Sequence, residues 1–305
     1  MEPMSQFPVV PITACALCNS NRPLRESHII PRFVFDWLVE SSGTGHMRFG
    51  PAMNLRVQDG VKQHLLCDEC EVRLSVWENE TARSLFKPYH RDTSTEITYG
   101  PWLAKFCASV CWRVLLIFRG LGIKNFSDTQ LLLADEALCS WSNLMFERAS
   151  HPGKFELHLL PVDLIVEAQG SELPPNMNRY LARAVEIDVV SNNTAAFVYA
   201  KMCKIILVGF VQMPNSREWE GTLVEMEQGT IKPGSRAAPG AFGNYLADRA
   251  RNMAALQAKI STRQKEKIER TMRANVDRVA NSESFAAISQ DVMIFGDSAF
   301  DEPED

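Results

Sequence analysis

Long apolar runs are absent from this sequence, and so is any excess of positive charge. The most apolar stretch, Ile205 to Val211, holds only seven residues, whereas a helix needs about 20 apolar residues to cross a bilayer. The first residues also lack the succession of basic, apolar and small residues that marks a secretory signal. We therefore expect a soluble protein of the cytoplasm that makes no contact with a membrane.

The formal net charge is −5 over 305 residues, which argues against a broad electrostatic surface for nucleic acid. The charge is unevenly distributed along the chain. Residues 249–278 hold nine Lys or Arg against three Asp or Glu, so this stretch carries +6 and the rest carries −11. If a surface outside the N-terminal region binds the phosphate groups of nucleic acid, we therefore expect it in this stretch.

Cysteine, in contrast, is well represented. The chain has eight cysteines, and four of them form two Cys-x-x-Cys pairs, Cys15 with Cys18 and Cys67 with Cys70. Two such pairs are the usual ligands of one tetrahedral zinc ion, and in a reducing compartment they indicate a metal site more often than disulfides. A zinc ion with four sulfur ligands has no open coordination position, so we expect this zinc to be structural.

A His-Ile-Ile-Pro segment at residues 28–31 lies between the two pairs, ten residues after Cys18, and a Leu-Leu dipeptide directly precedes Cys67. With the cysteine pairs, this pattern resembles the zinc-bearing branch of the HNH endonucleases, also called the ββα-metal or His-Me finger family. The resemblance covers roughly residues 10–85 and implies a treble-clef-like ββα-metal finger at the N-terminus.

The resemblance also implies roles for individual residues. His28 takes the place of the general base that activates a water molecule against the scissile phosphate. Ser27 and Glu71 take the two positions that hold a catalytic Mg²⁺ or Mn²⁺ ion. Ser27 replaces the usual Asp and is a weak ligand for a hard cation, whereas Glu71 replaces the usual Asn or His, so the site keeps one carboxylate.

Several assignments remain open at this stage. Lys62 occupies the position of the family's middle Asn, and it could contact a phosphate while Gln63 or His64 takes over the role of that Asn. Glu71 could instead be a solvated charge in the first turn of a helix, where its sign suits the helix dipole. Glu78, seven residues further along, could be a second metal ligand or a solvated residue. His28 could be a core residue or a spare structural ligand.

The patterns along the chain predict an α+β fold in two domains, a zinc-bearing domain over residues 1–90 and an α+β domain over residues 91–305. The resemblance implies that the first domain is of the HNH type. In the first domain, the patterns predict helices over 32–40 and 68–86, with a linker over 87–100. In the second, they predict helices within 101–150, an antiparallel sheet within 154–232 with one strand over 195–211, a long helix over 244–281 and a disordered acidic tail over 297–305.

The predicted helix over 244–281 has apolar residues at a spacing of three and four. It could form a coiled-coil-like contact, giving a homo-oligomer or a complex with a partner protein, or it could place a basic face on DNA. The resemblance to the HNH endonucleases implies a metal-dependent endonuclease acting on nucleic acid, with DNA favoured, in a setting such as bacterial restriction or antiphage defence. The alternative is a treble-clef module that binds nucleic acid or protein without catalysis.

Overall fold

The computed structural model describes residues 10–50, 52–167, 173–214, 216–232 and 240–301. It is a mixed α+β structure with small antiparallel sheets, as predicted. The chain forms two compact units, and neither is a continuous stretch. The first unit contains residues 1–31, 61–161 and 185–234, and the second contains residues 32–60, 162–184 and 235–305. The predicted boundary near residue 90 stays a prediction.

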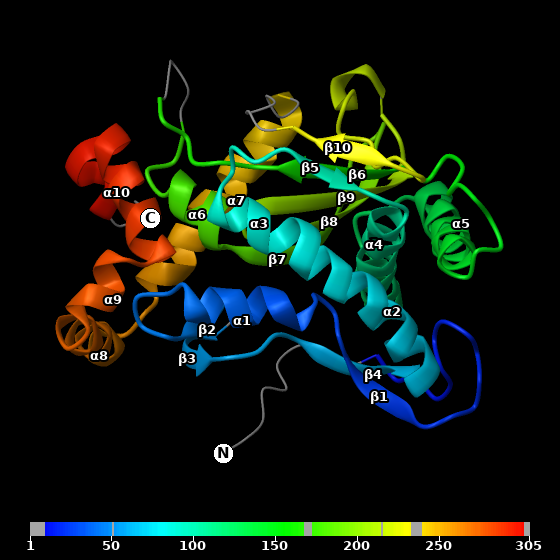
Figure 1. Ribbon diagram of the computed structural model, residues 1–305, viewed down its shortest axis with the longest axis horizontal. Coiled ribbons are helices and arrows are strands. Elements are labelled where there is room, and N and C mark those ends of the chain that lie inside the picture. The colour runs from blue at the N-terminus through cyan, green and yellow to red at the C-terminus, as the bar shows by residue number, and fades with distance from the viewer. Residues whose placement is uncertain (1–9, 51, 168–172, 215, 233–239, 302–305) are drawn as a thin grey trace. The chain divides into compact units, whose positions relative to one another are not determined.

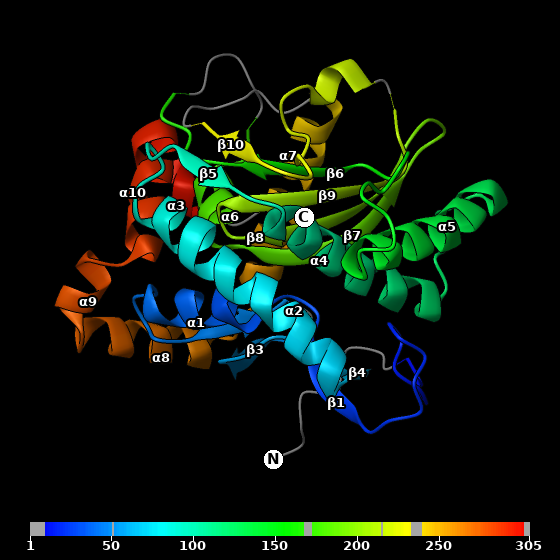
Figure 2. The ribbon, with the colours of Figure 1, turned by 45° about the vertical axis from the view of Figure 1, so that its right-hand side comes forward.

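The N-terminal part of the first unit is a two-stranded sheet followed by a long helix (Figure 1). Strand β1, Leu24–His28, pairs antiparallel with strand β4, Lys62–Cys67. Helix α2, Asp68–Thr81, begins directly after β4. It continues through a π-helical turn, η1, Ala82–Phe86, into α3, Lys87–Arg91 (Figure 2).

The helix is therefore longer than predicted, and part of the expected linker over 87–100 is regular structure. Pro88 does not end the helix, because it lies in the first turn of α3, where its missing amide hydrogen is tolerated. Strand β5, Ile97–Tyr99, follows and pairs with β10, Gly229–Ile231.

The rest of the first unit is a four-stranded antiparallel sheet that packs against two helices, α4, Trp102–Leu121, and α5, Asp128–Met145 (Figures 1 and 2). The strand order is β6-β9-β8-β7, with bounds Leu157–Pro161, Ile205–Gln212, Ala196–Met202 and Val185–Ser191. The packing is close at Gly209 of β9, because a Cβ there would lie 2.9 Å from the sulfur of Cys111. Cys107 and Cys111 are fully buried in α4 and belong to the core.

The prediction of a single strand over 195–211 is wrong. The chain turns at Cys203 and Lys204, where Cys203 has a φ of 56°, and β8 and β9 pair with each other on either side. Both strands are almost entirely buried. Residues 201–204 contain none of the Gly, Pro, Asn, Asp or Ser residues that usually mark a turn, which explains why the sequence pattern did not reveal one.

The second unit contains helix α1, Arg32–Glu40, at its predicted bounds, and a hairpin of β2, Met47–Phe49, and β3, Ala52–Val57. Helix α6, Met177–Arg183, was not predicted from the sequence. The remaining elements are α7, Gly240–Ala258; α8, Thr262–Arg273; α9, Val276–Ala280; α10, Glu283–Phe295; and a 3₁₀ turn, η3, Gly296–Phe300.

The prediction of one long helix over 244–281 is therefore wrong. The helix breaks at Ser261, which is extended (φ −62°, ψ 149°), and again at Asn275 (φ −137°, ψ 51°). Short polar side chains favour such positions at helix ends. The first break is fixed by a contact within the unit, since the side-chain oxygen of Asn54 accepts a 2.9 Å hydrogen bond from the amide of Ser261.

The predicted disordered tail over 297–305 is also partly wrong. Residues up to Phe300 belong to the 3₁₀ turn, and Ala299 is buried. Residues 302–305 lie outside the described residues. Among the described helices, none has the length and apolar content that a bilayer crossing requires.

Candidate metal centre and adjacent polar cluster

The two cysteine pairs lie together at the start of α2. The first pair is held in a tight turn, in which the amide of Cys15 donates to the carbonyl of Ser20 (2.9 Å) and the amide of Asn19 donates to the carbonyl of Cys15 (2.8 Å). Asn19 adopts a φ of 58°, which a short polar residue tolerates. A 2.9 Å bond from the amide of Ala16 to the carbonyl of Leu65 joins this turn to β4.

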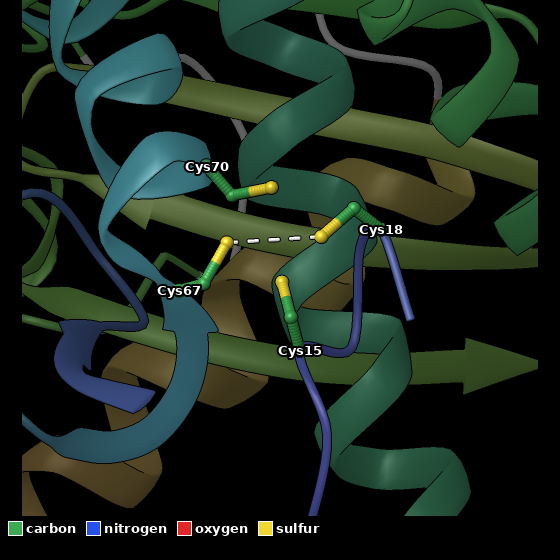
Figure 3. A group of neighbouring side chains, drawn as sticks. All are labelled: Cys15, Cys18, Cys67 and Cys70. Carbon is green, nitrogen blue, oxygen red and sulfur yellow. Dashed lines mark hydrogen bonds between the residues drawn. The ribbon is translucent and has the colours of Figure 1, made fainter. Parts of the chain in front are cut away.

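The four cysteine sulfurs converge on one point (Figure 3). The sulfurs of Cys15, Cys18, Cys67 and Cys70 all lie within 4.8 Å of one another, and those of Cys18 and Cys67 are 3.7 Å apart. Tetrahedral zinc with Zn–S bonds of about 2.3 Å requires sulfurs roughly 3.8 Å apart. The predicted set of four is thus brought together in a geometry compatible with a structural zinc site.

The electrostatic environment of the cysteines is uneven. Burial raises the pKa of Cys15 and Cys70 above the ordinary thiol value. Burial acts in the same direction on Cys18, but its hydrogen bonds with Ser20 and with neighbouring thiols outweigh it and lower the pKa to about 6. Metal-bound cysteines are thiolates, so a positive ion at this point would favour the ligand form of all four.

Ser27 and Glu71 meet next to the cysteine cluster. Ser27 is fully buried in β1 and lies opposite Gln63 of β4, while Glu71 follows Cys70 in the first turn of α2. The hydroxyl of Ser27 donates a hydrogen bond to the carboxylate of Glu71. Burial raises the pKa of Glu71, and the hydrogen bond from Ser27 partly offsets this effect. The two predicted ligand positions therefore form one small oxygen cluster.

A buried arginine contacts residues next to this oxygen cluster. Arg113 of α4 is 2% exposed, and its guanidinium forms a 2.8 Å ion pair with Glu78. It also donates a 2.7 Å hydrogen bond to the backbone carbonyl of His28 and a 3.2 Å bond to that of Ser109. The charges of Arg113, Glu78 and His28 all act on the pKa of Glu71, so the four groups are neighbours.

Sequence reasoning missed Arg113. The available signal was a single arginine in the middle of the apolar helix Trp102–Leu121, because a buried cation requires a partner. Glu78, one alternative for which was a second metal ligand, forms an ion pair with this arginine.

The other candidates are placed as follows. His28 ends β1 and is half-buried, and Lys62 lies directly across from it in β4. His64 is exposed across from Glu26, on the face opposite Ser27 and Gln63, and its Nδ1 is 3.3 Å from the carbonyl oxygen of Leu24. The structure therefore brings Ser27 and Glu71 together and places His28 next to Ser27 at the end of β1, with Lys62 across from His28. His64 lies across from Glu26, two positions further along β4.

The four cysteines are the one group of three or more Cys, His, Asp or Glu residues in the described part of the chain whose ligand atoms gather within 4.8 Å. His28, Glu71 and Glu78 do not form a second such group. No family model, no curated protein and no solved structure matches this chain.

Proposed function

We propose that this chain is a metal-dependent endonuclease of the HNH type that hydrolyses phosphodiester bonds, with DNA as the favoured substrate. The observation that carries the proposal is the meeting of Ser27 and Glu71, 44 positions apart in sequence, beside His28 and against the four-cysteine cluster. Zinc held by the cysteines serves as the scaffold, because a site with four sulfur ligands leaves no position for substrate.

His28 is the general base in this proposal. Its imidazole accepts the proton of the water whose oxygen attacks phosphorus, and the bond from phosphorus to the leaving oxygen breaks. The Arg113 hydrogen bond holds the backbone of His28 at the end of β1, so the imidazole is presented from a fixed point. A fixed base reduces the entropy lost in reaching the reacting geometry.

The oxygens of Glu71 and Ser27 would hold the divalent ion. Both are hard donors of the kind that Mg²⁺ and Mn²⁺ prefer. They already lie within hydrogen-bonding distance of each other, so both can face one ion. When bound, such an ion stabilises negative charge on the phosphate and on the leaving oxygen.

A non-catalytic binding module is the second candidate function, and one observation favours it. Glu78 is already paired with Arg113. In the described structure, Glu71 is therefore the one carboxylate of this cluster without a cationic hydrogen-bonding partner, and it alone would supply negative charge to a divalent ion. Ser27 contributes no charge. A zinc-stabilised finger of this kind could bind nucleic acid or protein through its surface alone.

Incubation of the purified full chain with supercoiled plasmid and either Mg²⁺ or Mn²⁺ separates the two functions. The nuclease proposal expects metal-dependent nicking that His28→Ala abolishes. His64→Ala is the matched control, because it removes an exposed histidine of the same strand pair that lies across from Glu26 and not across from His28, and it should nick like the parent. Absence of nicking with every metal, or equal nicking by His28→Ala, would favour the binding module.

A further inference from the structure

The outer side of the long helix beyond Glu78 carries a row of positive charge. Arg83, Lys87 and Arg91 follow one another at intervals of four residues across the π-helical turn and α3. All three side chains are exposed. With Asn79, Ala82 and Pro88 they line a shallow hollow of about 320 Å³ whose lining contains no carboxylate. In a chain with a net charge of −5, such a row is a local exception.

The π-helical turn aligns the row. A turn of this kind has more residues than an α-helical turn, so side chains four apart in it stay closer to one line along the axis. π-helical turns are rare and are frequent at functional sites. The small residue Ala82 and the ring of Pro88 leave the space between the cations open.

The cations are only lightly neutralised. Arg83 forms a 2.6 Å ion pair with Glu80, and the Arg83 side chain remains 77% exposed. No hydrogen bond or ion pair of the Lys87 or Arg91 side chain is found among the described residues. At most one of the three charges is thus compensated within the row, which leaves the surface suited to an anionic partner.

We propose that Arg83, Lys87 and Arg91 bind backbone phosphates of the duplex DNA that is cut at the His28 and Glu71 site. This inference rests on the proposed function. The row shares one continuous helix with Glu71, and Arg83 is about 18 Å along the axis from it at 1.5 Å per residue. A duplex parallel to the helix covers that distance in about five base pairs.

Charge complementarity favours a phosphate backbone over other anions. The cations recur at about 6 Å intervals, and a regular row suits the regular charges of a phosphodiester chain. Arginine guanidinium groups bind phosphate oxygens in a bidentate manner. The competing basic stretch, residues 249–278, belongs to the other compact unit.

The test is DNA binding by the full chain in a His28→Ala background, so that cleavage does not interfere. A fluorescent 20-base-pair duplex is titrated at several salt concentrations, and the variant is Arg83→Gln, Lys87→Gln, Arg91→Gln. We expect the dissociation constant to rise at least about tenfold and the salt dependence, as log K against log salt, to fall by about 2–3. The matched control is Arg263→Gln, Lys267→Gln, Arg270→Gln, which removes three exposed charges from α8 and should bind like the parent.

Zinc content and thermal midpoint equal to those of the parent show that the variant is folded. The proposal is overturned if the triple variant keeps the parent's affinity and salt dependence, if the α8 control shows the larger loss, or if the parent does not bind the duplex. It is also overturned if the triple substitution abolishes binding of an oligoglutamate peptide but leaves duplex binding unchanged. Loss of duplex binding in the triple variant of a chain that never nicks DNA would support the row while refuting the nuclease.

Discussion

The guanidinium of Arg113 donates a 2.7 Å hydrogen bond to the backbone carbonyl oxygen of His28, and the same group is ion-paired with Glu78 at 2.8 Å. One buried side chain from α4 therefore ties the end of β1 to the middle of α2. The strand pair and helix that carry the four cysteines are thus held by a residue that lies outside the stretch in which the cysteine and His-Ile-Ile-Pro motifs occur.

Arg113→Ala should lower the free energy of unfolding by about 3 kcal/mol, because removal of one partner of a buried ion pair leaves the other charge uncompensated. Arg25→Ala is the control, since its ion pair with Asp68 is exposed on both sides and should contribute less than about 1 kcal/mol. Urea unfolding of both variants measures the difference. Equal losses would show that Arg113 is no more important than a surface arginine.

The sequence predicted those features of the structure that are determined by residues close together in the chain. Helix α1 was predicted at its bounds because its apolar residues recur at helical spacing and polar residues follow it. The four cysteines were predicted to come together because their spacing is typical of one ion. The positions of Ser27 and Glu71 followed from the resemblance, and their hydrogen bond was beyond what a sequence can show.

The failures have a common physical origin in contacts between distant residues. The break at Ser261 depends on Asn54, 207 positions earlier, so the local periodicity over 244–281 continued past it without a signal. Similarly, the pattern in α4 marks Arg113 as a buried cation but does not name Glu78 and His28 as its partners. Tertiary contacts of this kind override local propensity.

Cys67→Ser should lower the zinc content by about one ion per chain and destabilise the finger. Structural zinc contributes on the order of 10 kcal/mol to the folding of small domains, so β1, β4 and the start of α2 are expected to lose their ordered structure. Cys139→Ser is the control, because Cys139 is exposed and is not part of the four-cysteine cluster. Metal analysis by atomic emission gives the result, and full zinc in Cys67→Ser would show that the four cysteines do not share one ion.

Lys201 should make the stability depend on pH. It is fully buried in β8, and burial lowers its pKa to about 7, with Cys203 partly offsetting the effect. Between about pH 7 and pH 10 the unfolded chain therefore binds more protons than the folded chain, so stability rises with pH across this window, by at most about 1.4 kcal/mol per pH unit. Below pH 7 both states are protonated and this contribution becomes constant.

Urea unfolding at pH 7, 8 and 9 measures this dependence, and Lys201→Met should reduce the slope because the titrating group is gone. The difference between parent and variant cancels the titration of the cysteines. Identical slopes in the two proteins would mean that Lys201 keeps an ordinary pKa.

Glu71→Gln should raise the thermal midpoint of the protein when no divalent ion is added. Burial disfavours the charged carboxylate, as its raised pKa indicates, whereas a glutamine amide keeps an oxygen to accept the Ser27 hydrogen bond. Added Mn²⁺ should then stabilise the parent but not the variant, because an ion that binds the folded state alone raises its stability. Differential scanning fluorimetry with zinc-loaded protein provides both measurements. An equal Mn²⁺ shift in both proteins would place the ion elsewhere.

Whether Ser27 and Glu71 face one catalytic ion is tested most directly by the rate of metal-dependent plasmid nicking. The rate is compared between the single variant Glu71→Gln and a double variant that combines Ser27→Asp with Glu71→Asn. Glu71→Gln should lower the rate at least about a hundredfold, because it removes the carboxylate from the site. The double variant moves that carboxylate to the other side of the ion and should recover measurable cleavage, short of the parent's rate because Asn is shorter than Glu. Nicking by Glu71→Gln at the parent's rate would contradict the account.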